Sequence, residues 1–199
     1  MADAGTGEQS SVILRTASVS LDSERYDEDV ARITALLGEA GGWAEYQSTS
    51  GEALAQNPEA GRYASMTLRV PAQALDGFVL SVRALGTLKS SELTAEDISA
   101  AYYDVQGRLG MYEAQRDRLK ELLGQAQSMA DIIEIEGRLS EVQYTIESLQ
   151  GRLNAWDSRA SHAVVYVSVC EVAPGGAYAR SSLGDRLLEE LENSLSAAK

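Results

Sequence analysis

Two segments near the middle of the chain carry apolar residues at the alternating three- and four-residue spacing of a heptad repeat. The first segment presents Ile98, Tyr102, Val105, Leu109, Tyr112, Arg116, Leu119, Leu123 and Ala126. The second presents Ile132, Ile135, Leu139, Val142, Ile146, Leu149, Leu153, Trp156 and Ala160. When the chain folds back between them, seam residues meet in pairs such as Leu119 and Leu139, whose residue numbers sum to 258. This symmetry predicts a long antiparallel coiled-coil hairpin, in which Ser128 caps the second helix.

The residues before the hairpin predict an α+β body in the order β-α-β-β-α-β, which is the ferredoxin-like pattern. Strands are expected at 12–21, 43–50, 62–70 and 87–93. One helix, capped by Asp22 or Ser23, is expected to end at Gly41 and Gly42, and another, with Pro71 in its first turn, is expected to end at Gly86. After the hairpin, the segment HAVVYVSVCEV is a strand with apolar residues on both faces. We therefore expect this returning strand to be covered on both sides.

These elements divide the chain into four parts. We expect a flexible leader at 1–11, a sheet domain at 12–95 plus 161–173, a hairpin insertion at 96–160, and a linker with a short amphipathic, juxtamembrane-like helix at 174–199. The last part carries a stripe of leucines at helical spacing, Leu183, Leu187, Leu191 and Leu195. The leader lacks the apolar core of a signal peptide, and the chain has no apolar run of membrane-spanning length.

Composition narrows the classes of partner and cofactor. The chain has 30 acidic and 17 basic residues and a formal net charge of −13, so it would be repelled by the phosphates of nucleic acids. We expect no nucleic-acid partner. Cys170 is the single cysteine, which rules out an intrachain disulfide or a cysteine-rich zinc site.

Catalytic motifs are absent from the sequence. His162 is the single histidine, and no accompanying nucleophile or acid is placed by a recognisable motif. Glu134 and Glu136 diverge on a helix, so they cannot act as a carboxylate pair. We expect a protein that is not an enzyme, with no catalytic residues, no cofactor and no metal.

The candidate functional feature is a stripe on the outer face of the second hairpin helix. Gly137, Tyr144 and Gly151 follow one another at seven-residue intervals, away from the seam. Each glycine costs a helix about 1 kcal/mol relative to alanine, so we expect a close contact here, with the sheet body or, less favoured, with a partner or a second copy. The alternative is that a long helix tolerates the cost. On the seam, we expect Arg116 to reach Glu113 or Glu141.

The hairpin, with the stretch D-I-I-E-I-E-x-x-L-x-x-V at 131–142, resembles the bacterial domain of unknown function 4349. The resemblance covers residues 12–195 and includes the strand RTASVSL, the helix ending in GGW and the closing strand. It implies an envelope protein with a signal or lipoprotein sequence before the domain and one membrane helix after it. It supplies no activity and no catalytic residues.

Together these observations predict a non-catalytic, extracytoplasmic and membrane-tethered interaction or sensing module of the bacterial cell envelope. Two alternatives remain open at this point. The first is a structural spacer or homo-oligomerisation domain, and the second is a hydrolase whose site the sequence does not reveal.

Overall fold

The computed structural model describes residues 11–57 and 61–173. Within these ranges the fold is mixed α+β, with a five-stranded sheet and four helices, as the sequence predicts at this level. The elements follow in the order β1 (Ile13–Ser23), α1 (Tyr26–Glu39), β2 (Trp43–Ser50), β3 (Tyr63–Pro71), α2 (Leu75–Arg83), β4 (Thr87–Asp97), α3 (Ser99–Gln125), α4 (Met129–Ser161) and β5 (His162–Glu171).

The returning strand β5 lies at the centre of the sheet. The strand order is β2-β3-β5-β1-β4, and β5 runs parallel to β1 and antiparallel to β3. In a four-stranded ferredoxin-like sheet the first and third strands would be neighbours, whereas here β5 separates them. The last described strand thus joins two halves of the sheet that precede it in the chain.

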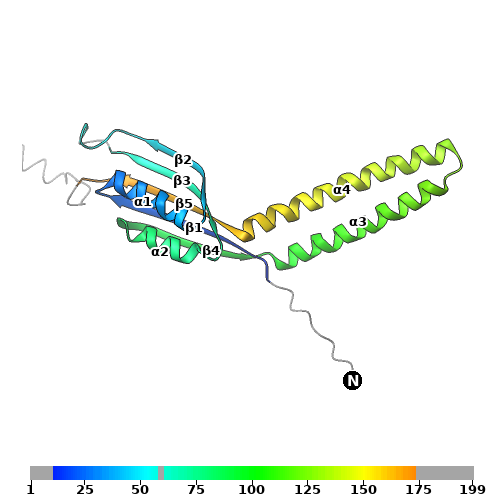
Figure 1. The fold of residues 1–199 in the computed structure, drawn as a ribbon, viewed down its shortest axis with the longest axis horizontal. Helices are drawn as coiled ribbons and strands as arrows, with labels where there is room; N and C mark the ends of the chain where they lie inside the picture. Colours follow the sequence, from blue (N-terminus) through cyan, green and yellow to red (C-terminus); the bar gives the residue numbers. More distant parts are fainter. Residues whose placement is uncertain (1–10, 58–60, 174–199) are drawn as a thin grey trace, which may run out of the picture.

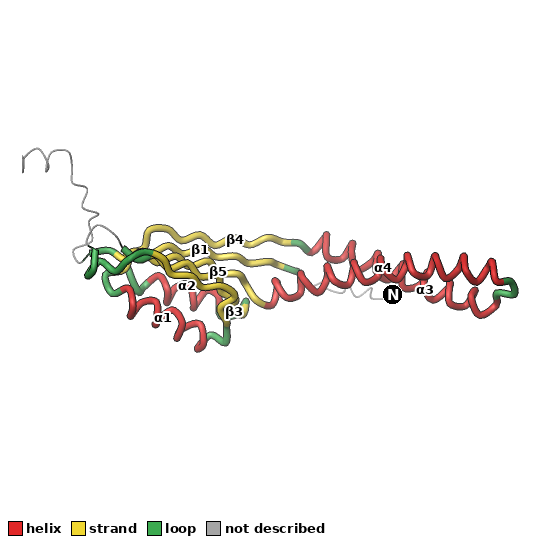
Figure 2. Tube along the Cα trace, turned by 90° about the horizontal axis from the view of Figure 1, so that it is seen from above, coloured by secondary structure: helices red, strands yellow, loops and turns green. Residues whose placement is uncertain are grey.

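Helices α1 and α2 cover one face of this sheet (Figures 1 and 2). Both helices carry apolar residues at helical spacing, and these pack on the inward side chains of the strands. The core includes Ile33, Leu37, Phe78 and Val82 from the helices. Its strand residues are Ala17, Val19, Leu21, Ala64, Met66, Leu68, Val70, Ala163, Val165, Val167 and Val169.

The opposite face of the sheet has no covering layer within the described residues, and we call it the open face. On β5 it carries Val164, Tyr166, Ser168 and Cys170, none of which is buried. The expectation that β5 is covered on both sides is therefore wrong. The reason lies in the topology of the sheet, because α1 and α2 both pack on the same face. The neighbouring strands β3 and β1 supply the rest of the burial of β5.

Helices α3 and α4 form a pair that leaves the sheet and projects away from it (Figure 1). They pack through the expected seam residues in two clusters, one around Val105, Leu149 and Leu153 and one around Leu119, Val142 and Ile146. Ser128 caps α4, since its Oγ accepts a hydrogen bond from the Asp131 N–H at 3.1 Å. We call α3 and α4 the helix pair.

Arg116 has a different partner from the one the sequence suggests. Its Nε donates to Asp117 Oδ1 at 2.9 Å, rather than reaching Glu113 or Glu141. The side chain stays about one quarter exposed, so its charge is not buried in the seam. The leucine stripe of 183–195 lies outside the described residues.

Candidate functional site

The predicted stripe on α4 is exposed to solvent along the helix pair. Tyr144 keeps 76% of its surface accessible, and a Cβ added at Gly137 or Gly151 would meet nothing within 4 Å. The expectation that the sheet body packs on this stripe is therefore wrong. The reason is that the helix pair projects past the end of the sheet instead of folding over it (Figure 1). The stripe stays a predicted interaction face.

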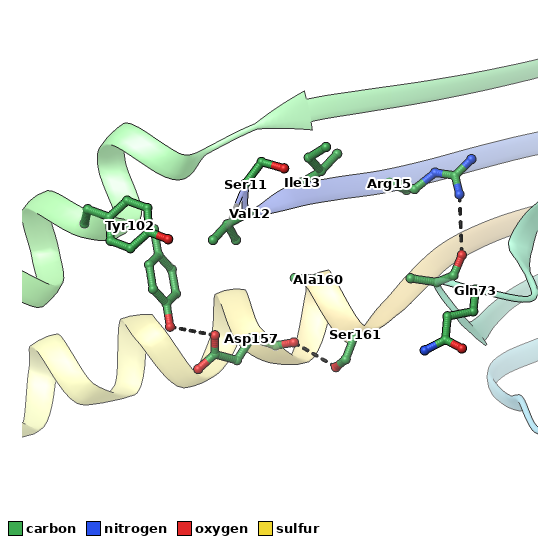
Figure 3. Close-up of a pocket in the computed structure, with 11 residues that line it drawn as sticks. Ser11, Val12, Ile13, Arg15, Gln73, Tyr102, Asp157, Ala160 and Ser161 are labelled. Carbon is green, nitrogen blue, oxygen red and sulfur yellow. Dashed lines mark hydrogen bonds between the residues drawn. The ribbon is translucent and has the colours of Figure 1, made fainter. Parts of the chain in front are cut away.

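A cleft lies where the helix pair joins the sheet, and we call it the junction cleft. Its volume is about 570 Å³. Side chains from β1, the start of α3 and the end of α4 line it (Figure 3). The lining residues are Ser11, Val12, Ile13, Arg15, Ala72, Gln73, Tyr102, Tyr103, Asp157, Ala160 and Ser161.

Backbone hydrogen bonds fix the walls of the junction cleft. The Ile98 N–H donates to Val12 O at 2.9 Å, and the Val12 N–H donates to Ser99 Oγ at 2.8 Å. On the other wall, the Ala72 N–H donates to Ser161 O at 2.9 Å. Both helices of the pair are thus tied to the sheet at the point where they leave it.

A tyrosine and an aspartate bridge the two helices inside the junction cleft. The Tyr102 hydroxyl donates to Asp157 Oδ1 at 2.9 Å (Figure 3). This hydrogen bond, together with desolvation, raises the pKa of Tyr102. The shift strengthens a preference that a phenol already has near neutral pH, so Tyr102 stays protonated and acts as the donor. The sequence carried a signal for this pair, because Asp157 follows Trp156, the seam partner of Tyr102.

The positive charge of Arg15 in the junction cleft is already balanced. Arg15 Nη2 lies 2.6 Å from Asp76 Oδ1 on α2, and its Nη1 donates to Ala72 O at 3.4 Å. The hydrogen bond from Arg15 lowers the pKa of Asp76, so the carboxylate stays charged. The cleft therefore offers hydroxyl and amide groups to a ligand, together with the carboxylate of Asp157, which is hydrogen-bonded to Tyr102.

His162 lies at the start of β5 beside the junction. The centre of its ring lies 4.9 Å from that of the Trp43 ring, with the two planes inclined by 58°, and Nδ1 is 3.1 Å from Ser161 Oγ. The contacts with Trp43 and Ser161 indicate that the His162 imidazole has a packing role. Among the described residues, no group of three or more His, Cys, Asp or Glu side chains is placed to hold a metal ion.

A second charged cluster lies at the opposite end of the sheet, where β5 ends. Arg62 forms hydrogen bonds of 2.8 and 3.0 Å with Asp27, and of 3.0 and 3.1 Å with Glu171. Its guanidinium also sits 4.4 Å from the centre of the Tyr26 ring. The hydrogen bond from Arg62 lowers the pKa of Glu171, and burial raises the pKa of the Cys170 thiol.

The hydrogen bonds of this cluster link α1, the residue before β3 and the end of β5. The sequence analysis did not predict this cluster. Its members are far apart in the chain and belong to no motif. Its role follows from its geometry: Arg62 is satisfied on both sides, so the cluster stabilises the fold rather than presenting a free charge.

Comparison with known proteins places these features in a family. A family model described as Domain of unknown function (DUF4349) matches residues 11–198. The chain belongs to the DUF4349 family. The match extends over both the sheet body and the helix pair, so the two are parts of one DUF4349 domain. No curated protein and no solved structure matches the chain.

Neither the long helices of the pair nor any other helix in residues 11–57 and 61–173 combines the length and apolarity needed to cross a bilayer.

Proposed function

We propose that this DUF4349 domain is a non-catalytic, extracytoplasmic module, tethered to the membrane of the bacterial cell envelope, whose helix pair contacts a partner protein. The observation that carries the proposal is the projection of the pair with its Gly137, Tyr144 and Gly151 stripe uncovered. We also propose that the helix pair is an antiparallel coiled coil. The sheet body is then a ferredoxin-like unit with β5 as an additional strand.

The stripe has the features of a contact surface. Glycines on an exposed helix cost about 1 kcal/mol each relative to alanine, and within the described chain no packing offsets that cost. A partner that approaches the bare backbone at Gly137 and Gly151 would gain close packing. Tyr144 between them supplies a large, rigid side chain of the type that dominates protein interfaces.

The proposed location rests on the family resemblance. That resemblance implies a signal or lipoprotein sequence before the domain and one membrane helix after it, and with this arrangement the helix pair would project into the envelope. The acidic charge of −13 fits a role in which the domain stays away from anionic lipid headgroups while tethered near them.

Site-specific crosslinking in cells tests the proposal. A photoreactive residue at Tyr144 should give a discrete adduct in the membrane fraction, and the same probe at Leu80 should not. Leu80 is a matched control because it is 67% exposed, on α2 of the sheet body. Adding Gly137→Ala and Gly151→Ala should weaken the adduct while raising the stability of the isolated domain by about 1 kcal/mol per site. Equal adducts at both positions, or none at Tyr144, would reject the proposal.

Exposed apolar residues near the tip of the helix pair favour a second candidate, a homo-oligomerisation or spacer domain. Met129 and Ile133 are 71% and 64% exposed, and Leu122 is also exposed. Light scattering coupled to size exclusion distinguishes the two candidates. A stable dimer that dissociates with Ile133→Glu supports self-association, and a monomer at every concentration excludes it.

A further inference from the structure

Five serines form a continuous row across the open face, one on each strand. The pairing is Ser48 with Ser65, Ser65 with Ser168, Ser168 with Ser20, and Ser20 with Ser90. Directly paired residues point to the same side of a sheet, so all five hydroxyls face the side opposite α1 and α2. We call these residues the serine row.

Tyrosines flank the serine row on both sides, so the row forms the floor of a groove. Tyr166 precedes Ser168 by two residues on β5, and Tyr63 precedes Ser65 by two residues on β3, opposite Cys170. Tyr166 and Tyr63 are 51% and 42% exposed. The groove between them has a volume of about 230 Å³, and its lining includes Ser20, Ser65, Ser90 and Ser168.

The groove offers hydrogen-bonding capacity that the described chain leaves unused. The hydroxyls of the serine row make no hydrogen bond with any other part of the described residues. Each hydroxyl can donate one hydrogen bond and accept two. An apolar partner laid on this row would leave those groups buried and unsatisfied, at a cost of about 1–3 kcal/mol each. The groove therefore suits a ligand that is itself rich in hydroxyl or amide groups.

The electrostatics of the groove favour an uncharged ligand. Its lining contains no charged side chain, whereas the whole chain has a net charge of −13. Two ion pairs lie elsewhere on the open face, Arg69 with Glu45 at 2.9 Å and Asp22 with Lys89 at 3.5 Å, and Glu92, opposite Ser18, adds a negative charge beside the groove. An anionic polymer would gain no ion pair in the groove and would be repelled by the surrounding acidic surface.

We propose that this groove binds an extended, uncharged β-1,4-linked glycan strand. The strand crosses the β-strands along the serine row, with its sugar rings against Tyr166 and Tyr63. Neighbouring β-strands lie about 4.8 Å apart, close to the length that one ring adds to such a chain, so successive sugars meet successive serines. The tyrosine rings supply flat apolar area for the sugar faces, and the serines supply adaptable hydrogen bonds. The inference goes beyond the proposed function, because it uses a different surface from the helix pair.

Calorimetric titration of the full chain with chitohexaose tests this proposal. We expect saturable binding with Kd at or below about 1 mM, whereas maltohexaose, which has the same ring count but α-linkages, should not bind. Tyr166→Ala should raise Kd about tenfold, and Ser168→Val about fivefold. Tyr144→Ala is the matched control, because it removes an exposed tyrosine from the helix pair and should leave Kd unchanged.

Each variant is first checked for a native thermal unfolding transition, and Tyr63→Ala replaces Tyr166→Ala if the latter does not fold. Absence of saturable binding, equal binding of maltohexaose, or an unchanged Kd in the groove variants would overturn the proposal. The same holds if chitohexaose does not bind and Tyr166→Ala converts a dimer to a monomer, since a second copy of this chain would then be the occupant. The crosslinking result at Tyr144 does not affect this outcome.

Discussion

At the scale of single residues, ion pairs between distant segments set the geometry of the domain. Arg62 joins α1 to β5 through Asp27 and Glu171, and Arg15 joins β1 to α2 through Asp76. Of these pairs, that of Arg62 with Glu171 is the more enclosed, because the Glu171 side chain is only 12% exposed. Its backbone neighbours add further hydrogen bonds, from the Leu54 and Arg62 N–H groups. Of the carboxylates in these three ion pairs, Glu171 is therefore the one whose charge should matter most for folding.

Glu171 should make folding stability depend on pH in the acid range. Its pKa is lower in the folded chain than in the unfolded one, because Arg62 hydrogen-bonds its charged form. Such a group stabilises the fold fully above its unfolded pKa of about 4.3, and this contribution is lost as pH falls through the folded pKa. Glu171→Gln should therefore cost about 1–3 kcal/mol at pH 7 and less at pH 3, which lies below the unfolded pKa. Denaturant unfolding at both pH values checks this, and an equal loss at both would contradict it.

At the scale of elements, local periodicity was enough to place most helices and strands. The heptad spacing predicted the helix pair and its facing residues, since seam packing depends on sequence separation along two continuous helices. The place of β5 could not be predicted, because strand pairing is decided by long-range contacts rather than by its own sequence. The open face and the serine row were missed for the same reason: five separate serines become a row only once the register of every strand is fixed.

A substitution in the seam should destabilise the helix pair without destabilising the sheet. Ile146 is 1% exposed within the pair and touches no residue of the sheet core. Ile146→Ala should destabilise the pair by about 2–4 kcal/mol, because it leaves a cavity between α3 and α4. Hydrogen exchange should then accelerate in residues 105–146 while β1, β3 and β5 stay protected. Gly137→Ala serves as the control, and acceleration across the whole sheet would contradict the expectation.

At the scale of the whole molecule, the domain is elongated. The 33 residues of α4 alone extend for about 50 Å, and the pair points away from the sheet (Figure 1). One end therefore carries the exposed stripe of Gly137, Tyr144 and Gly151, and the other carries the open face. This shape separates two candidate surfaces within one domain.

The elongated shape should be measurable in solution. A compact globule of this length would have a radius of gyration of about 16 Å. Small-angle X-ray scattering should give a clearly larger value, with a long tail in the distance distribution. A radius near the compact value would mean that the helix pair folds back over the sheet, and would remove the basis of the proposed function.

The central position of β5 has a consequence for the order of folding. The pairing of β1 with β5 joins opposite ends of the described chain, and such distant contacts are slow to form because a large loop must close first. Formation of the helix pair shortens the effective loop that must close. Once α3 and α4 have packed together through local contacts, the end of β4 and the start of β5 are held on the two sides of β1, so β5 is near the gap between β1 and β3. We therefore expect the helix pair to promote folding by aiding the pairing of β5 with β1 and β3. That pairing completes the sheet.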